Sequence, residues 1–433
     1  MTDPHTDQTT GLMNLQGALA WLQSSISELR PDLGLHLLIV DVDGFRRINE
    51  GYGSEVGDQV LADVAERLRH VLTHGELVAR LDSDKFVVGF VDDLDHDLVG
   101  DAQRIVGQFS SRMLVGGAPR SVSVSVGALV CDESTRSPQE LLRDSRLALQ
   151  CAKHKGASGV CLFDEAARAS NERRRLLERD LPNAAARHEL VVLYQPVIEV
   201  ASGRVAGAEA LVRWQHPELG LVSPDEFIPL AEETGDILDI GRFVIREAAR
   251  TATLLRHGFD RPLHIAVNVS GRQFADLGLV QSIQRAARQA GCRISDLVIE
   301  VTETALAHDT ELAHDTLIEL QAIGVRVAVD DFGTGYSSLS QLRELPVDIL
   351  KIDQSFVSGV PADTQDLAVV TAVINMARAL GKILVAEGVE TEEQRLALLA
   401  LGCQLAQGYL WARPGSADAL LALIASEPDP ALT

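Results

Sequence analysis

The second half of the chain contains a series of short apolar segments, which constrains the fold more than any other feature. Eight segments have the length and composition of β-strands, and helical patterns separate them. They are 190–194, 204–210, 264–269, 297–301, 326–329, 349–352, 383–386 and 406–410. Eight strands that alternate with helices over about 240 residues predict a (β/α)8 barrel. The reactive groups of such a barrel lie at the C-terminal ends of its strands.

Polar residues stand near the ends of seven of these strands. They are Glu209, Asn268, Glu300, Asp330 with Asp331, Lys351, Glu387 and Gln407. Unpaired charges are strongly disfavoured inside apolar segments. Cations bound by several of these acidic residues at once would explain why all of them occur there. Carboxylate and amide oxygens without His or Cys favour magnesium or manganese over zinc. The sequence therefore predicts two divalent metals about 4 Å apart, which would hold both the attacking and the leaving oxygen of a phosphoryl displacement.

Taken alone, the adjacent residues Asp330 and Asp331 allow two interpretations. Two neighbouring carboxylates repel each other unless a cation lies close, which favours a metal site. Asp and Gly are also among the commonest turn residues, so an ordinary turn fits equally well. Single residues such as Asn268 and Gln407 likewise have plain alternatives, as a strand-end cap and a surface amide. The joint pattern favours the metal site.

Several stretches of this half resemble the EAL family of cyclic di-GMP phosphodiesterases, in family order, from about residue 174 to residue 414. These stretches are Glu209-Ala210-Leu211, Asn268-Val269-Ser270, Glu300-Val301-Thr302-Glu303, Asp330-Asp331-Phe332-Gly333-Thr334-Gly335, Lys351-Ile352-Asp353, Glu387-Gly388-Val389-Glu390 and Gln407-Gly408-Tyr409. The resemblance implies metal-dependent hydrolysis of cyclic di-GMP to linear pGpG. A receptor for cyclic di-GMP, or an interaction scaffold without turnover, remains the alternative.

The resemblance also implies a role for each matched position. The implied metal ligands are Glu209, Asn268, Glu300, Asp330, Asp331 and Glu387. Lys351, Glu387, Glu209 and Asp330 are the implied catalytic residues. Gln195, Arg213 and Asp353 resemble substrate contacts, although Arg213 and Asp353 taken alone would fit ordinary salt bridges. Gln407 resembles a residue that orders the site, and Glu303 resembles the glutamate that supports the loop after Asp331.

The first half of the chain has the pattern of a separate α/β domain. Helical patterns at 13–29, 56–72 and 138–153 alternate with strand patterns at 35–40, 76–81, 86–91 and 121–130. The tight spacing of the middle strands predicts a mostly antiparallel sheet. We expect this domain at 12–163, a charged helical connector at 164–187 and the barrel at 188–430.

This first domain resembles the GGDEF family of diguanylate cyclases, with an altered signature. The match includes Asp41-Val42-Asp43-Gly44-Phe45 and, where the family has Gly-Gly-Asp-Glu-Phe, the chain reads Asp82-Ser83-Asp84-Lys85-Phe86. Asp82 brings a side chain and a negative charge to a place where glycine lets backbone approach a triphosphate. Lys85 replaces an acid by a base, Ala157 stands where an arginine would bind phosphate, and residues 73–76 lack the product-inhibition motif. We predict no cyclase activity.

Four positions of the domain still match nucleotide contacts. Asn49 and Asp58 match the positions that read guanine, and Asp41 with Asp84 matches a metal pair. A carboxylate can accept hydrogen bonds from guanine, so recognition of GTP could outlast catalysis. One interpretation is weak GTP binding that regulates the phosphodiesterase, and the other, equally favoured, is a domain kept for folding or dimer contacts.

Composition excludes several other classes of protein. A formal net charge of -23 argues against a nucleic-acid partner, because binding to phosphate backbones depends on Lys and Arg. No apolar stretch has the length of a membrane helix and no signal peptide is recognised, so we expect a cytoplasmic protein. The five cysteines are odd in number and indicate buried or idle thiols rather than disulfides or a zinc site. The expected partners are cyclic di-GMP, GTP and a second copy of the chain, bound through the EAL domain.

Overall fold

The computed structural model describes residues 4–30, 32–71, 77–132, 136–154, 158–308, 310–333 and 345–427. The chain divides into two compact units, Met1–Leu176 and Leu177–Thr433, each with its own apolar core. Residues 73–76, Ala157, Thr334 and Gly335, to which the sequence predictions refer, lie outside the described residues.

The N-terminal unit is built on a five-stranded sheet with the order β2-β3-β1-β6-β7. Strands β1, β2, β3 and β6 pair antiparallel, and only β7 pairs parallel, with β6. This arrangement confirms the predicted mostly antiparallel sheet. The strands are β1 Leu33–Val42, β2 Leu77–Asp82, β3 Lys85–Asp93, β6 Val124–Cys131 and β7 Val160–Leu162, with a separate hairpin of β4 Met113–Val115 and β5 Ala118–Arg120.

Strand β1 is buried on both faces because helices cover both sides of the sheet. Leu38 and Val40 pack in an apolar cluster with helix α3, whereas Leu37 and Ile39 pack in a second cluster with helix α1. The alternation follows from the strand period of two residues. The helices of this unit are α1 Leu15–Ser27, α2 Phe45–Tyr52, α3 Ser54–Val71, α4 Leu98–Gln108 and α5 Pro138–His154; α6 Glu165–Asp180 contains the boundary between the units.

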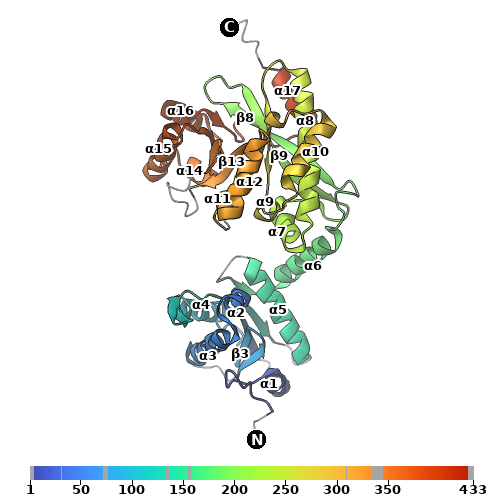
Figure 1. Cartoon of the computed structure of the whole chain (residues 1–433). Helices are drawn as coiled ribbons and strands as arrows, with labels where there is room; N and C mark the ends of the chain where they lie inside the picture. Colours follow the sequence, from blue (N-terminus) through green and yellow to red (C-terminus); the bar gives the residue numbers. More distant parts are fainter. Residues whose placement is uncertain are drawn as a thin grey trace. The chain divides into compact units, whose positions relative to one another are not determined.

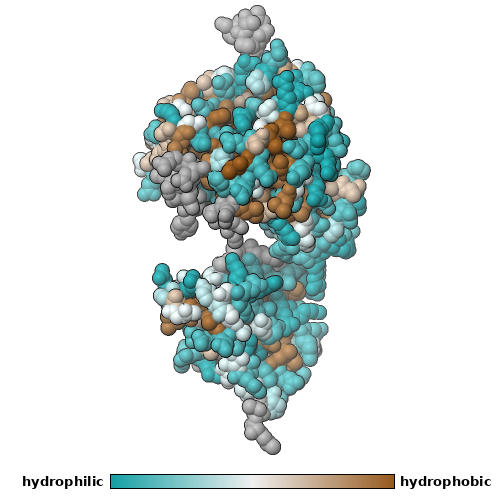
Figure 2. Space-filling model, in the orientation of Figure 1, coloured by the Kyte–Doolittle hydropathy of each residue, from teal (hydrophilic) through white to brown (hydrophobic). Residues whose placement is uncertain are grey.

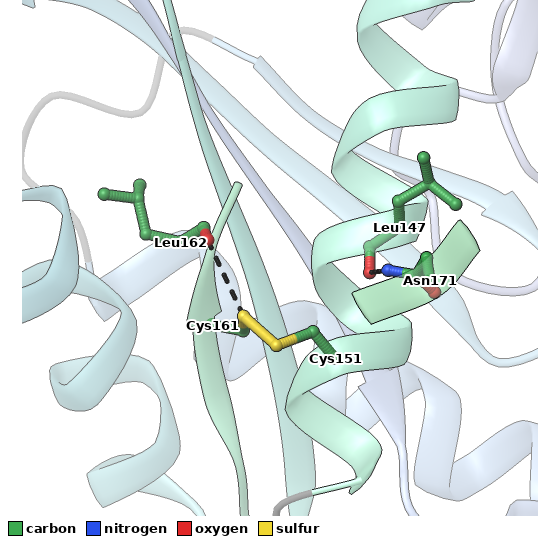
Figure 3. Close-up of a disulfide and its surroundings, with 5 residues drawn as sticks. All are labelled: Leu147, Cys151, Cys161, Leu162 and Asn171. Carbon is green, nitrogen blue, oxygen red and sulfur yellow. Dashed lines mark hydrogen bonds between the residues drawn. A yellow bond between two sulfur atoms is a disulfide. The ribbon is translucent and has the colours of Figure 1, made fainter. Parts of the chain in front are cut away.

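The cysteine interpretation is wrong for one pair. Cys151, near the end of α5, and Cys161, in β7, form a disulfide across a separation of ten residues (Figure 3). Their spacing gave no sign of it, because only the return of β7 alongside β6 brings the second cysteine toward α5. Cys131, Cys292 and Cys403 form no disulfide among the described residues, and Cys131 and Cys403 are buried as expected.

The C-terminal unit is an eight-stranded barrel with one short additional strand. Around the barrel the strands follow the order β9, β11, β12, β13, β14, β15, β16 and β8. Strand β8 also pairs with β9, which closes the barrel. The barrel prediction is confirmed. The strands are β8 Leu190–Glu199, β9 Val205–His216, β11 His264–Asn268, β12 Leu297–Thr302, β13 Arg326–Phe332, β14 Ile349–Ile352, β15 Ile383–Ala386 and β16 Leu405–Ala406, with β10 Gly220–Val222 at the edge of β9.

One strand of the barrel runs against the others. Strand β8 pairs antiparallel with both β9 and β16, and a short turn at Gly203 joins it to β9. Figure 1 shows helices α8, α10, α12 and α15 outside the strands, where they cover the barrel. The helices of this unit are α7 Pro224–Thr234, α8 Ile237–Gly258, α9 Gly271–Phe274, α10 Leu279–Ala290, α11 Glu303–His308, α12 Thr310–Ala322, α14 Gln354–Val357, α15 Thr364–Ala379, α16 Glu392–Leu401 and α17 Ala417–Ala425.

The inside of the barrel is layered by the strand period of two residues. Its middle layer is apolar, and it contains Ala266, Val298, Ala328, Ile349 and Val385. Two residues further along each of these strands stands a polar residue of the predicted site. The apolar layer therefore supports the polar layer at the C-terminal ends of the strands.

The visible face of the molecule is mostly hydrophilic, with hydrophobic patches on both units (Figure 2). Among the helices that the structure describes, none has both the length and the apolar character needed to cross a membrane.

Candidate active site

Lys351 stands at the centre of the polar layer. Its side chain, on β14, is 2% exposed. The ammonium nitrogen Nζ lies 2.6 Å from Glu387 Oε1, 2.8 Å from Glu300 Oε2, 3.1 Å from Asp330 Oδ1 and 3.4 Å from Glu209 Oε2. Four carboxylates from four other strands of the barrel therefore share one buried cation.

Two amide side chains fix the carboxylates. Asn268 Nδ2, at the end of β11, donates to Glu209 Oε1 at 2.5 Å. Gln407 Nε2, directly after β16, donates to Glu209 Oε2 at 2.6 Å and to Glu387 Oε1 at 3.1 Å. Both oxygens of Glu209 thus accept a hydrogen bond from an amide. Among the described residues, nothing donates to the buried Oε1 atom of Gln407.

The crowding of charge shifts the pKa values of these groups. Burial, with the negative charges of Asp330 and Glu209, raises the pKa of Glu387 to about 7, against the opposing effect of Lys351. Burial also raises the pKa of Glu300 well above its ordinary value. Although burial acts to lower it, the surrounding carboxylates raise the pKa of Lys351 well above its ordinary value. The carboxylates around Lys351 therefore favour its protonated form.

Asp331 adds a fifth carboxylate beside this cluster. It follows Asp330 with a φ of 55°, a left-handed conformation that is uncommon outside glycine. One carboxylate oxygen each from Asp330, Asp331 and Glu387 can lie within 4.8 Å of one another, as metal ligands do. Burial and the charges of Asp330 and Asp353 raise the pKa of Asp331. Five carboxylates thus face one ammonium, an imbalance that two divalent cations would balance.

This donor set fits hard metals. It consists of carboxylate and amide oxygens, which magnesium and manganese prefer, and it contains no thiolate or imidazole. The buried Oε1 of Gln407 accepts no hydrogen bond from the described residues, so it is one more oxygen atom available to a metal. The residues present therefore fit the divalent metals that the sequence predicted.

The three predicted substrate contacts differ in how close they lie to the carboxylate cluster. Gln195 is buried on β8, directly across the strand pair from Glu209. Asp353 caps the N-terminus of α14 and lies close enough to Asp331 to raise its pKa. Arg213, four residues beyond Glu209 on β9, donates from Nη1 to the carbonyl of Val212 at 2.8 Å. Among the described residues, no hydrogen bond or ion pair joins the guanidinium of Arg213 to the carboxylate cluster.

Glu303 contacts the start of the loop that follows Asp331. The backbone N–H of Gly333 donates to Glu303 Oε2 at 3.3 Å, and the side chain of Glu303 is buried. Residues 334–344 of this loop lie outside the described part of the chain.

The four residues predicted to contact GTP lie in the N-terminal unit. Asp41 is buried at the end of β1, Asp84 lies in the turn between β2 and β3, and Asp58 is exposed on α3. The Oδ1 atom of Asn49, on α2, is buried without a hydrogen-bond donor among the described residues. The sequence gave no role to Lys153, whose Nζ lies 2.5 Å from Asp41 Oδ1. Its position beside Asp41 follows from the packing of α5 on the sheet.

Comparisons with known proteins agree with this geometry. The chain matches the EAL domain family over residues 178–414 and the family described as diguanylate cyclase, GGDEF domain, over residues 4–159. It is 38% identical over 405 residues to the bifunctional diguanylate cyclase/cyclic di-GMP phosphodiesterase MucR of Pseudomonas aeruginosa, across 93% of this chain and 59% of that protein. It is 33% identical over 411 residues to the cyclic di-GMP phosphodiesterase PdeR of Escherichia coli, across 95% of this chain and 62% of that protein.

A solved structure is similar to the barrel. It is described as the PaMucR phosphodiesterase in complex with c-di-GMP, and it shares 44% identity with a TM-score of 0.55 over 57% of this chain and 99% of that one. The chain spans about half the length of several curated relatives that it matches. Because the EAL match covers more than half of its residues, the chain belongs to the EAL family, and it carries a GGDEF-type domain before the barrel.

Proposed function

We propose that this chain hydrolyses cyclic di-GMP to linear pGpG at the C-terminal end of the barrel, with magnesium or manganese. The observation that carries the proposal is the burial of Lys351 among four carboxylates. A binding protein needs contacts to bases and phosphates, but it has no need for a buried ammonium and a surplus of carboxylates. The names of MucR and PdeR support the same substrate.

The residues that would hold the two metals are Glu209, Asn268, Glu300, Asp330, Asp331 and Glu387. When bound, divalent metals supply Lewis acidity to the attacking water and to the phosphate oxygens. Each role below belongs to the side chains of the protein itself.

Lys351 places a fixed positive charge where negative charge develops on the phosphorus oxygens during displacement. Glu387, which contacts Gln407 and Lys351, would take a proton from the attacking water. Gln407 orients both Glu209 and Glu387, and Asn268 holds the second oxygen of Glu209. Gln195, Arg213 and Asp353 contact the substrate, and Glu303 positions the loop that begins at Gly333.

The alternative is a cyclic di-GMP receptor or scaffold without turnover. The experiment that decides is incubation of the purified chain with cyclic di-GMP and magnesium or manganese, followed by separation of pGpG. We expect turnover by the wild type and its loss in Glu209→Ala. Glu393→Ala, a change of an exposed carboxylate on α16, serves as the matched control and should keep wild-type activity. Binding of cyclic di-GMP without any pGpG in either metal would establish the receptor instead.

For the N-terminal domain we propose a regulatory role without cyclase activity. The altered signature at residues 82–86 supports the absence of cyclisation, and the retained Asn49 and Asp58 support weak GTP binding. A purely structural role in folding or dimer contacts is the alternative. Titration calorimetry with GTP separates them, because no heat at high nucleotide concentration would end the regulatory proposal.

We also propose that the chain forms a homodimer through its EAL domain. Hydrophobic patches are visible on that unit (Figure 2), and exposed apolar side chains there include Ile318 on α12, which is 46% exposed. Light scattering on the purified chain tests the proposal, and a monomer at micromolar concentration would contradict it.

A further inference from the structure

A lysine occupies the acidic centre of the N-terminal domain. Lys85 begins β3, where its Cα pairs with that of Asp41 on one side and with that of Asp82 on the other. Its Nζ lies 3.2 Å from Asp82 Oδ1, 3.2 Å from Asp84 Oδ1 and 3.7 Å from Asp41 Oδ2. One ammonium thus joins three carboxylates, including the pair Asp41 and Asp84 that matches the metal ligands of the GGDEF family.

Two further cations complete the balance of charge. Lys153 Nζ, from α5, lies 2.5 Å from the other oxygen of Asp41. Arg146, also from α5, brings Nη2 to 3.7 Å from Asp82 Oδ2. Three carboxylates therefore face three cationic groups, in contrast to the barrel site, where five carboxylates face one.

These residues do not fit a divalent metal. Magnesium requires near-octahedral oxygen ligands at about 2.0–2.1 Å, and an ion held by Asp41 and Asp84 would lie a few ångströms from the ammonium of Lys85. Two cations in one small site repel each other, and the carboxylates already have a partner.

We propose that Lys85 is a built-in substitute for the metal: it closes the Asp41–Asp84 pair to divalent cations, and a nucleoside triphosphate bound there is bound without metal. The second part rests on the proposed GTP binding, whereas the first does not. It follows that a metal shortage would stop turnover in the barrel but leave nucleotide binding by the N-terminal domain intact.

The first experiment counts manganese ions on the full chain by equilibrium dialysis. We expect Lys85→Glu, which restores an acid at this position, to bind one more Mn²⁺ per chain than the wild type. Arg46→Glu makes the same change of charge at an exposed residue of α2 in the same unit, and it should leave the count unchanged. Equal counts for the wild type and a folded Lys85→Glu would overturn the proposal. If Lys85→Glu does not fold, judged by circular dichroism, Lys85→Gln replaces it with the same expectation at lower affinity.

The second experiment measures binding of a non-hydrolysable fluorescent GTP analogue in magnesium and in EDTA. The wild type should bind equally well in both, whereas Lys85→Glu should lose about tenfold or more in EDTA, within the usual range of coupling between two ligands. Metal-dependent binding by the wild type would contradict metal-free recognition. If the wild type binds no analogue under either condition, GTP recognition is refuted, together with the metal-free binding built on it. The manganese count then decides separately whether Lys85 closes the site.

Discussion

Replacement of Lys351 by methionine tests the centre of the barrel site most directly. The change keeps much of the side-chain volume and removes the charge that four carboxylates share within 3.4 Å. Removing one partner of a buried ion pair costs about 3–5 kcal/mol, because the remaining charges are left buried without compensation. For a unit of this size, each kcal/mol lowers the midpoint of thermal unfolding by about 2–4 °C. We therefore expect Lys351→Met to lower the midpoint of the barrel by about 6–20 °C in the absence of metal.

Divalent metal should reverse part of this loss. Without the ammonium, an added metal no longer competes with a built-in cation for the carboxylates. A ligand that binds only the native state adds about 2.7 kcal/mol of stability when its concentration is 100 times its Kd. Manganese should therefore raise the unfolding midpoint of Lys351→Met more than that of the wild type. Turnover should nonetheless fall by about 100- to 1,000-fold, as when a group that stabilises charge in the transition state is removed.

The assay is thermal unfolding followed by circular dichroism, with EDTA and with manganese, beside pGpG production under the same conditions. Arg242→Met is the matched control, because Arg242 pairs with Asp239 on the exposed face of α8 and its side chain is 51% exposed. A surface pair of this kind contributes about 0–1 kcal/mol, so little should change. Wild-type stability in EDTA together with wild-type turnover for Lys351→Met would refute the reasoning.

Two further predictions follow from single contacts. Gln407→Leu removes the amide that donates to Glu209 and Glu387, so affinity for Mn²⁺ should fall by about 10- to 100-fold, measured by titration calorimetry; unchanged affinity would show that the carboxylates hold their positions unaided. Reduction of the Cys151–Cys161 disulfide should lower the unfolding free energy of the N-terminal unit by about 2–4 kcal/mol in denaturant titrations. Cys151→Ser should show that loss already and respond no further to reductant, and a wild type indifferent to reductant would speak against the bond.

Local sequence determined the layers of the barrel. Because side chains alternate along a strand, the polar residue at each strand end and the apolar residue two positions before it could be assigned to one inner face from the sequence alone. Glu300 and Val298 are one such pair, and Asp330 and Ala328 are another. The short periodic segments also predicted the mostly antiparallel sheet of the first unit, since tight connections leave adjacent strands little choice of direction.

The tertiary structure decided which of these residues share a partner. Glu209 and Lys351 are 142 residues apart, and their contact depends on the closure of the barrel and on the register of several strands. The disulfide at Cys161 likewise depends on the pairing of β7 with β6, which no local pattern specifies. The sequence has Lys85 where the GGDEF family has an acid. Only the register of β1, β2 and β3 brings the ammonium of this lysine close to three carboxylates at once. The sequence determines which polar side chain each strand carries. The long-range pairing of the strands determines which of these charges lie close together, and Coulomb energies depend on that distance in space.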